Sequence, residues 1–365
     1  MIKNYLFQAD LVRALAILAV IGIHLVIPIT PRPDYFGGTI WWLAFLLNCL
    51  FRISVPLFVI LSGYLVLGKP SSIHENFKRI TQRILIPLIA YYIIFNIIYA
   101  LMAWLRFEPY DYAGIFHNLS KNTHTSLYFL VVLFFIQFLN PLWNLLTEPK
   151  NEKVLKYTCY FFLGLGAASY IFYYLSLREG EVFSTFTYWI MWIGYYLYGY
   201  LVKLKSTILS KAETIVYSLI FIASFIFTAF FGYLTLWLFH NNVSDLFYIG
   251  GQTYADSYLS ISVMLMSLSA FNLLMRGSWV QKLETISWIK KPISFIAVLS
   301  FALYLNHLLV IDTLSKFFGI NPDSPSMPSL AIYLIISTIL TFLITIPLVL
   351  LIQKTPYLRK IVGLK

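Results

Sequence analysis

An arginine and a histidine, Arg13 and His24, stand eleven residues apart in the first apolar segment of the chain. At about 100° per residue, eleven steps along an α-helix place both side chains on one face, about 16 Å apart along the axis. A guanidinium group can hold a phosphate through two parallel hydrogen bonds. A neutral imidazole can act as a general base, because its ordinary pKa is near 6.5. The pair therefore suits a long donor with a charged end and a reactive end.

Each of these two residues also has a purely structural interpretation. Arg13 can be an anchor at the membrane interface that pairs with Asp10, since long basic side chains extend toward the lipid headgroups. His24 can be hydrogen-bonded between helices. Their shared helix face is the observation that favours one common passage.

The second apolar segment adds an ionisable group and two special backbone positions. Arg52 lies near its centre, too deep to reach the headgroups, and we expect it to face protein or a water-filled cavity. Pro56 frees a backbone carbonyl and predicts a kink. Ser62-Gly63 allows either close helix packing or close approach of a ligand to the backbone.

Two further groups of polar residues have both structural and functional interpretations. Arg79 and Arg83 are four apart and on one side of any helix formed there, so they can clamp a phosphate, although such a basic loop also contacts lipid headgroups. Late in the chain, Ser300, Tyr304 and His307 form a polar stripe. This stripe either joins helices or lines a substrate path.

The elements that must position these residues are membrane helices. Of 365 residues, 60% are hydrophobic and only 11% are charged, whereas an ordinary soluble domain has about 25% charged residues. This composition excludes a soluble globule and a disordered chain. The net charge of +11 is typical of basic cytoplasmic loops and needs no nucleic acid. Cys49 and Cys159 lie in apolar runs, which gives a disulfide framework no support.

Ten apolar runs are long enough to predict an all-α polytopic membrane protein with about ten transmembrane helices in a single domain over residues 1–365. They are Leu11–Ile29, Trp41–Leu67, Ile84–Trp104, Leu127–Leu146, Val154–Leu175, Tyr188–Val202, Thr214–Phe239, Asp256–Met275, Ile293–Leu314 and Ser329–Ile352. Most lysines and arginines fall in alternate connections, which places both termini in the cytoplasm. The long outer loops, Arg106–Ser126 and His240–Ala255, either line an acceptor entrance or form an interfacial aromatic belt.

Four of these motifs, in this order, resemble the acyltransferase-3 family of integral membrane acyltransferases. They are Arg13-x10-His24, Val55-Pro56-Leu57-Phe58 running into Ser62-Gly63-Tyr64, Arg79-x3-Arg83 and Ser300-x3-Tyr304-x2-His307, and the resemblance runs from Asp10 to the tenth apolar segment. The chain departs from the family at Ser126-Leu127-Tyr128-Phe129-Leu130, with His124 just before, where relatives often have Trp-Phe-Leu. Tyr128 keeps an aromatic surface there, and the role of that position stays open.

The resemblance implies an acyl-CoA-dependent O-acyltransferase, typically an O-acetyltransferase of a bacterial cytoplasmic (inner) membrane. The donor is usually acetyl-CoA from the cytosol, and the acceptor is a hydroxyl of a cell-envelope glycan or lipid-linked saccharide. By this resemblance His24 is the catalytic base, while Arg13, Arg79 and Arg83 bind the donor. Arg52, Tyr304 and His307 are unranked candidates for binding substrate and stabilising the oxyanion, and an acyl-histidine step stays open. Membrane lipid is the surrounding partner, and neither a metal nor a nucleic acid is expected.

The main alternative is a transporter or flippase of glycan intermediates, in which the same polar stripes line a permeation route. A transporter needs no coenzyme A, so binding of acetyl-CoA distinguishes the two classes. A purely structural scaffold leaves the shared face of Arg13 and His24 without a reason.

Overall fold

The computed structural model describes residues 6–69, 71–109, 127–176, 185–205, 207–249, 251–318, 320 and 330–354. The protein is an all-α polytopic membrane protein, and the described part contains only one small β-hairpin. The first half contains α1 (Phe7–Val26), α2 (Thr39–Phe51), α3 (Ser54–Val66), α4 (Ile73–Ile80), the π-helical turn η1 (Thr81–Leu85), α5 (Ile86–Leu105), α7 (Tyr128–Phe138), α8 (Asn140–Leu146), the 3₁₀ turn η2 (Pro149–Asn151) and α9 (Glu152–Ser176). The second half contains α10 (Thr185–Tyr188), η3 (Trp189–Trp192), α11 (Ile193–Leu204), α12 (Lys211–His240), β1 (Tyr248–Ile249), β2 (Gln252–Thr253), η4 (Tyr254–Asp256), α13 (Ile261–Arg276), α14 (Ser278–Thr285), α15 (Ser287–Phe318) and α16 (Leu330–Lys354).

The number of helices able to cross a membrane is slightly lower than the ten we predicted. Within the described ranges there are eight, or nine if α7 and α8, which meet at a 59° bend, form one span. The remaining segment, Tyr188–Val202, is η3 followed by the 12-residue helix α11. Twelve residues span about 18 Å, less than the ~30 Å hydrocarbon core. Because α11 is almost wholly buried against α3 and α9, protein rather than lipid surrounds this short segment.

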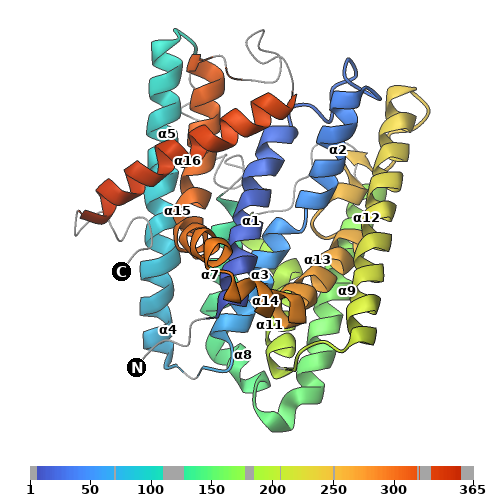
Figure 1. Ribbon diagram of the computed structural model, residues 1–365, viewed down its shortest axis with the longest axis vertical. Helices are drawn as coiled ribbons and strands as arrows, with labels where there is room; N and C mark the ends of the chain where they lie inside the picture. Colours follow the sequence, from blue (N-terminus) through green and yellow to red (C-terminus); the bar gives the residue numbers. More distant parts are fainter. Residues whose placement is uncertain are drawn as a thin grey trace.

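The basic connections between helices lie mostly at one end of the bundle. Figure 1 places the start of α1 at the same end of the bundle as α4, α8, α11 and α14. These elements and their connections carry most of the basic residues that we predicted to lie inside: Lys69, Lys78, Arg79, Arg83, Lys150, Lys153, Lys203, Lys205, Lys211, Arg276, Lys282, Lys290 and Lys291. We call this end the basic end. Its cytoplasmic location stays a prediction of the positive-inside rule.

Two helix breaks follow from proline chemistry. Proline lacks the N–H group that would bond the carbonyl four residues earlier, and its ring crowds that carbonyl. For Pro56 this is the carbonyl of Arg52, and the helix is indeed interrupted there, between α2 and α3. For Pro141 it is the carbonyl of Gln137, at the α7–α8 bend. The Nδ2 group of Asn76 donates to that freed carbonyl at 2.9 Å, so the break leaves it satisfied.

One predicted boundary is wrong in an informative way. We expected a helix from Asp256, whereas α13 begins at Ile261. The preceding residues form the β1–β2 hairpin and η4, and this segment buries Asp256 inside the bundle. Apolar composition alone could not distinguish this irregular segment from the first turn of a helix.

Glycines allow α3 and α11 to pack backbone to backbone. A Cβ atom on Gly63 would lie 1.8 Å from the carbonyl oxygen of Tyr196, and one on Gly199 would lie 2.0 Å from that of Ile60. We therefore expect Gly63→Ala and Gly199→Ala each to destabilise the protein by about 1–3 kcal/mol through overpacking. Thermal unfolding in detergent measures this effect. The matched control is Gly164→Ala in α9, where a Cβ meets nothing within 4 Å; equal stability of all three variants would contradict the prediction.

Candidate active site

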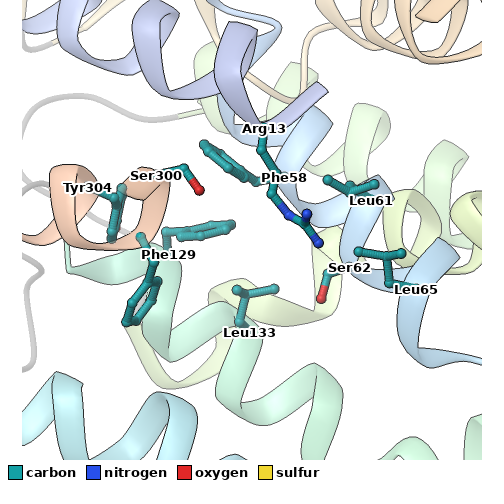
Figure 2. A pocket seen from close by; sticks show the side chains of 10 residues that line it. Arg13, Phe58, Leu61, Ser62, Leu65, Phe129, Leu133, Ser300 and Tyr304 are labelled. Atoms are coloured by element: carbon teal, nitrogen blue, oxygen red, sulfur yellow. The ribbon is translucent and has the colours of Figure 1, made fainter. Parts of the chain in front are cut away.

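A cavity of about 200 Å³ lies between α1, α3, α7 and α15. Figure 2 shows Arg13 extending into it from α1 toward Ser62, with Ser300 and Tyr304 on the opposite side. Pockets that enclose a whole drug-sized ligand usually measure roughly 300–1,000 Å³, so this cavity has room for one end of a longer molecule. Its lining residues are mainly apolar: Arg13, Phe58, Leu61, Ser62, Leu65, Phe129, Leu133, Ser300, Phe301 and Tyr304.

Arg13 brings a cation to the wall of this cavity. Its Nη1 atom donates to Oδ1 of Asp10 at 2.8 Å, one turn earlier on α1, so the predicted pair with Asp10 is present. The Arg13 side chain remains about one-third exposed. A guanidinium group carries five N–H donors, so this contact leaves others for a ligand in the cavity.

Tyr304, in the wall of the cavity, packs next to a pair of histidines. The Tyr304 side chain lines the cavity, and its ring centroid lies 5.9 Å from that of His307, one turn further along α15. The His307 ring in turn lies 5.0 Å from the His24 ring on α1. His24 itself is not among the residues that line the cavity. The hypothesis that Arg13 and His24 border one passage therefore stays a prediction, with Tyr304 and His307 between them.

His307 is held in one orientation by the backbone of its own helix. Its Nδ1 atom lies 2.6 Å from the carbonyl oxygen of Tyr304. A carbonyl oxygen can only accept, so a neutral His307 carries its proton on Nδ1 and leaves Nε2 as an acceptor. The residue is fully buried, and Nε2 has no hydrogen-bond partner in the described part of the chain. The ring thus presents an unused acceptor inside the bundle.

Arg52 is buried in an ion pair with Asp256. Its side chain is 4% exposed, and its Nη2 atom lies 3.4 Å from Oδ2 of Asp256. The guanidinium carbon also lies 5.4 Å from the centroid of the Tyr258 ring. The ring of the preceding residue, Phe51, packs against Gly22 of α1, two residues before His24. These contacts confirm that Arg52 faces protein rather than lipid, and they link the helix break to the turn of α1 that precedes His24.

Several buried polar atoms around these residues have no hydrogen-bond partner among the described residues. They include Nε of Arg52, the hydroxyl groups of Tyr128 and Tyr304, Nε2 of His307 and Nε1 of Trp192. Native interiors normally satisfy buried polar groups, so an unsatisfied set is typical of a site that receives water or a ligand. Tyr128, at the position where relatives often have tryptophan, packs its ring 5.9 Å from Tyr188 and 6.4 Å from Trp192. Both His124 and Ser126, just before it, lie outside the described residues.

The two predicted phosphate-binding arginines, Arg79 and Arg83, lie in different environments. The helix that holds Arg79 begins with a capping box between Ser72 and Glu75, which fixes the first turn of α4. Arg79 is partly buried, and its Nη2 atom donates to Oδ1 of Asn76 at 2.6 Å. Arg83 lies in the π-helical turn and is exposed. No contact within the described ranges joins the two guanidinium groups.

A polar network connects Arg79 with the cavity wall. Asn76 donates to the Gln137 carbonyl, and the Gln137 side chain donates to Oγ of Ser62 at 2.8 Å. Asn140 donates to Oδ1 of Asn76 and accepts from the Tyr196 hydroxyl. Because Ser62 lines the cavity beside Arg13, Arg79 is joined to that wall through α4, α7 and α3.

The sequence did not lead us to every residue of the site. It singled out Arg13 and Tyr304, which line the cavity, and His24 and His307, whose rings form the histidine pair. It also singled out Arg52, which lies in the ion pair with Asp256. It missed Asp256, Asn48 and Tyr258. The rule that singled out Arg52, an ionisable side chain in an apolar segment, could have found Asp256 as well. At the predicted start of a helix, however, a carboxylate does not by itself indicate a buried site.

Comparisons with known proteins give one match. A family model described as an acyltransferase domain matches residues 7–348, almost the whole chain. No curated protein and no solved structure matches significantly.

Proposed function

Because the chain belongs to the acyltransferase-3 family, and is therefore a membrane acyltransferase, we propose that it moves an acetyl group from acetyl-CoA to a hydroxyl of a cell-envelope glycan or lipid-linked saccharide. We place it in a bacterial cytoplasmic membrane, with its basic end in the cytosol. The observation that carries this proposal is the cavity that begins at Arg13 and ends at Tyr304, whose ring contacts His307 and, through it, His24.

The donor enters from the basic end. Its phosphates bind Arg79, Arg83 and Arg13, and its pantetheine arm occupies the largely apolar cavity. This division suits the cavity volume of about 200 Å³, which has room for the thin arm while the nucleotide stays outside. The thioester then lies beyond Tyr304, next to His24.

The reaction is a direct acyl transfer. The acceptor hydroxyl donates its proton to a ring nitrogen of His24 while its oxygen attacks the thioester carbonyl carbon. The tetrahedral intermediate collapses, the carbon–sulfur bond breaks, and the coenzyme A thiolate takes the proton from His24. An oxyanion forms on the carbonyl oxygen. Nε–H of Arg52 and the Tyr304 hydroxyl, two of the donors without a partner in the described chain, stabilise it.

The test of this function uses the purified protein in lipid vesicles. Acetyl-CoA labelled in its acetyl group is supplied with an envelope glycan fraction, and both released coenzyme A thiol and labelled glycan are measured. The proposal expects equal amounts of thiol and O-acetyl ester. Translocation of the glycan without any use of acetyl-CoA would instead support the alternative, a transporter of glycan intermediates.

The contribution of Arg79 to donor binding can be measured separately. A charge-assisted hydrogen bond contributes about 1.5–3 kcal/mol, so we expect Arg79→Gln to raise the KM for acetyl-CoA about tenfold or more with little change in kcat. The KM values of acetyl-CoA and its 3′-dephospho analogue are compared as well. If Arg79 binds the 3′-phosphate, the wild type distinguishes the two donors and the variant does not. Lys156→Gln, an exposed cation paired with Glu152 in α9, is the control. An unchanged KM for Arg79→Gln would contradict the assignment.

A further inference from the structure

Neutral side chains hold the carboxylate of Asp256 independently of its contact with Arg52. Its Oδ2 atom accepts from Nδ2 of Asn48 at 3.0 Å, and its Oδ1 atom accepts from Oγ1 of Thr253 at 3.2 Å. The Thr253 side chain also accepts from the backbone N–H of Asp256 at 3.3 Å, which closes the η4 turn. Both oxygens and the backbone are therefore constrained, and the carboxylate has one defined position.

Arg52 uses only a small part of its hydrogen-bonding capacity on this carboxylate. The contact is a single Nη2–Oδ2 approach of 3.4 Å, and Asn48 shares the same oxygen. A structural arginine–carboxylate pair more often uses two parallel hydrogen bonds. Here Nε of Arg52 stays buried and has no partner in the part of the chain that the structure describes. The pair thus holds the guanidinium group while leaving one directional donor free.

The position of this donor connects it to the chemistry. Arg52 lies at the break between α2 and α3, and the ring of the residue before it, Phe51, packs against Gly22 of α1, two residues before His24. An uncompensated cation buried at this depth would be costly, and Asp256 supplies the compensating negative charge. The arrangement therefore gives a nearly neutral pair whose free N–H is fixed rather than mobile.

We propose that Asp256 is a positioning residue of the active site: held by Asn48 and Thr253, it fixes the Arg52 guanidinium next to the turn of α1 that precedes His24, so that the free Nε–H donates to the developing oxyanion. The inference rests on the proposed acyl transfer and assigns it a residue outside the family motifs quoted above. An electrostatic donor acts best when it is fixed before the reaction begins, since no reorganisation is then needed in the transition state.

The first experiment is Asp256→Asn, which keeps the shape and removes the charge. Initial rates of coenzyme A release from acetyl-CoA are measured in vesicles supplied with the envelope glycan fraction. Loss of one oxyanion donor costs roughly 10²–10³ in kcat, so loss of its positioning is expected to lower kcat about tenfold or more, with the KM for acetyl-CoA unchanged. The matched control is Glu213→Gln, because Glu213 pairs with another buried arginine, Arg276, at 3.5 Å, and glutamine preserves its capping role in α12.

A second variant separates positioning from a structural role. Replacing a buried ion pair by apolar side chains usually preserves folding, so Arg52→Met with Asp256→Leu is expected to fold with a thermal midpoint near that of the wild type. If the pair only stabilised the bundle, this double variant would be active. Positioning predicts a folded protein that binds acetyl-CoA and has at least the kcat loss of Asp256→Asn.

These experiments distinguish a failure of the proposed function from a failure of the inference about Asp256. A wild-type protein that releases no coenzyme A would overturn the proposed function and this inference together. An active wild type with a normal kcat in Asp256→Asn, or in the folded double variant, would overturn the inference alone.

Discussion

Replacing His24 with alanine is expected to reduce acyl transfer by about 10²–10⁴-fold, the usual contribution of a general base. His24 lies in α1 with its ring 5.0 Å from that of His307. Without a base, no side chain takes the proton from the acceptor hydroxyl as its oxygen attacks the carbonyl carbon. Because the donor binds through the arginines at the basic end, we expect the KM for acetyl-CoA to stay nearly constant.

The measurement for His24 is the rate of coenzyme A release, with labelled glycan as the second readout. His24→Asn is compared with His24→Ala, since an amide keeps a hydrogen-bonding group in the bundle but cannot act as a base. His74→Ala in α4 is the control, because that histidine is exposed. Normal turnover by well-folded His24→Ala would refute the proposed mechanism.

Replacing Arg13 with glutamine is expected to raise the KM for acetyl-CoA about 10–100-fold, from the loss of one or two charge-assisted hydrogen bonds. Arg13 lines the cavity, and its contact with Asp10 leaves other N–H donors available. Arg13→Lys keeps the charge but loses the planar pair of donors, so it should fall between the wild type and Arg13→Gln. If Arg13 were only an interfacial anchor, the KM values for acetyl-CoA of these three proteins would not follow this order.

The control for Arg13 is another arginine that pairs with a nearby aspartate. Arg32, in the connection between α1 and α2, pairs with Asp34, and its side chain is 37% exposed. Arg32→Gln should leave the KM for acetyl-CoA unchanged. Direct binding of acetyl-CoA, measured by calorimetry, excludes a kinetic origin of the difference, and equal affinities of the Arg13 and Arg32 variants would contradict the role of Arg13.

Local periodicity predicted the parts of the site that depend on a single helix. The arithmetic for Arg13 and His24 needs only the pitch of α1, and the polar stripe of α15 needs only the spacing of Ser300, Tyr304 and His307. The break at Arg52 follows from Pro56 four residues later. The sequence also left two interpretations of Ser62-Gly63. The structure shows the close helix packing, of Gly63 against α11, whereas the approach of a ligand stays a prediction, with Ser62 in the cavity wall.

The parts that the sequence could not predict depend on contacts between distant segments. Asp256 lies 204 residues from Arg52 in the chain, and nothing local to either residue identifies the other. The π-helical turn η1, which separates the environments of Arg79 and Arg83, has no apolar periodicity of its own. The sequence does not distinguish the short buried helix α11 from a full span, because burial by protein and burial by lipid require the same apolar residues.

The most direct test of the central claim is a structure of the protein with an acetyl-CoA analogue in which a methylene group replaces the thioester sulfur. We predict that the pantetheine arm occupies the cavity between Arg13 and Tyr304. The carbonyl carbon should then lie within roughly 6 Å of a ring nitrogen of His24, which leaves room for one hydroxyl group between them. A carbonyl group bound elsewhere, or a donor that reaches His24 from the end opposite Arg13, would contradict the claim.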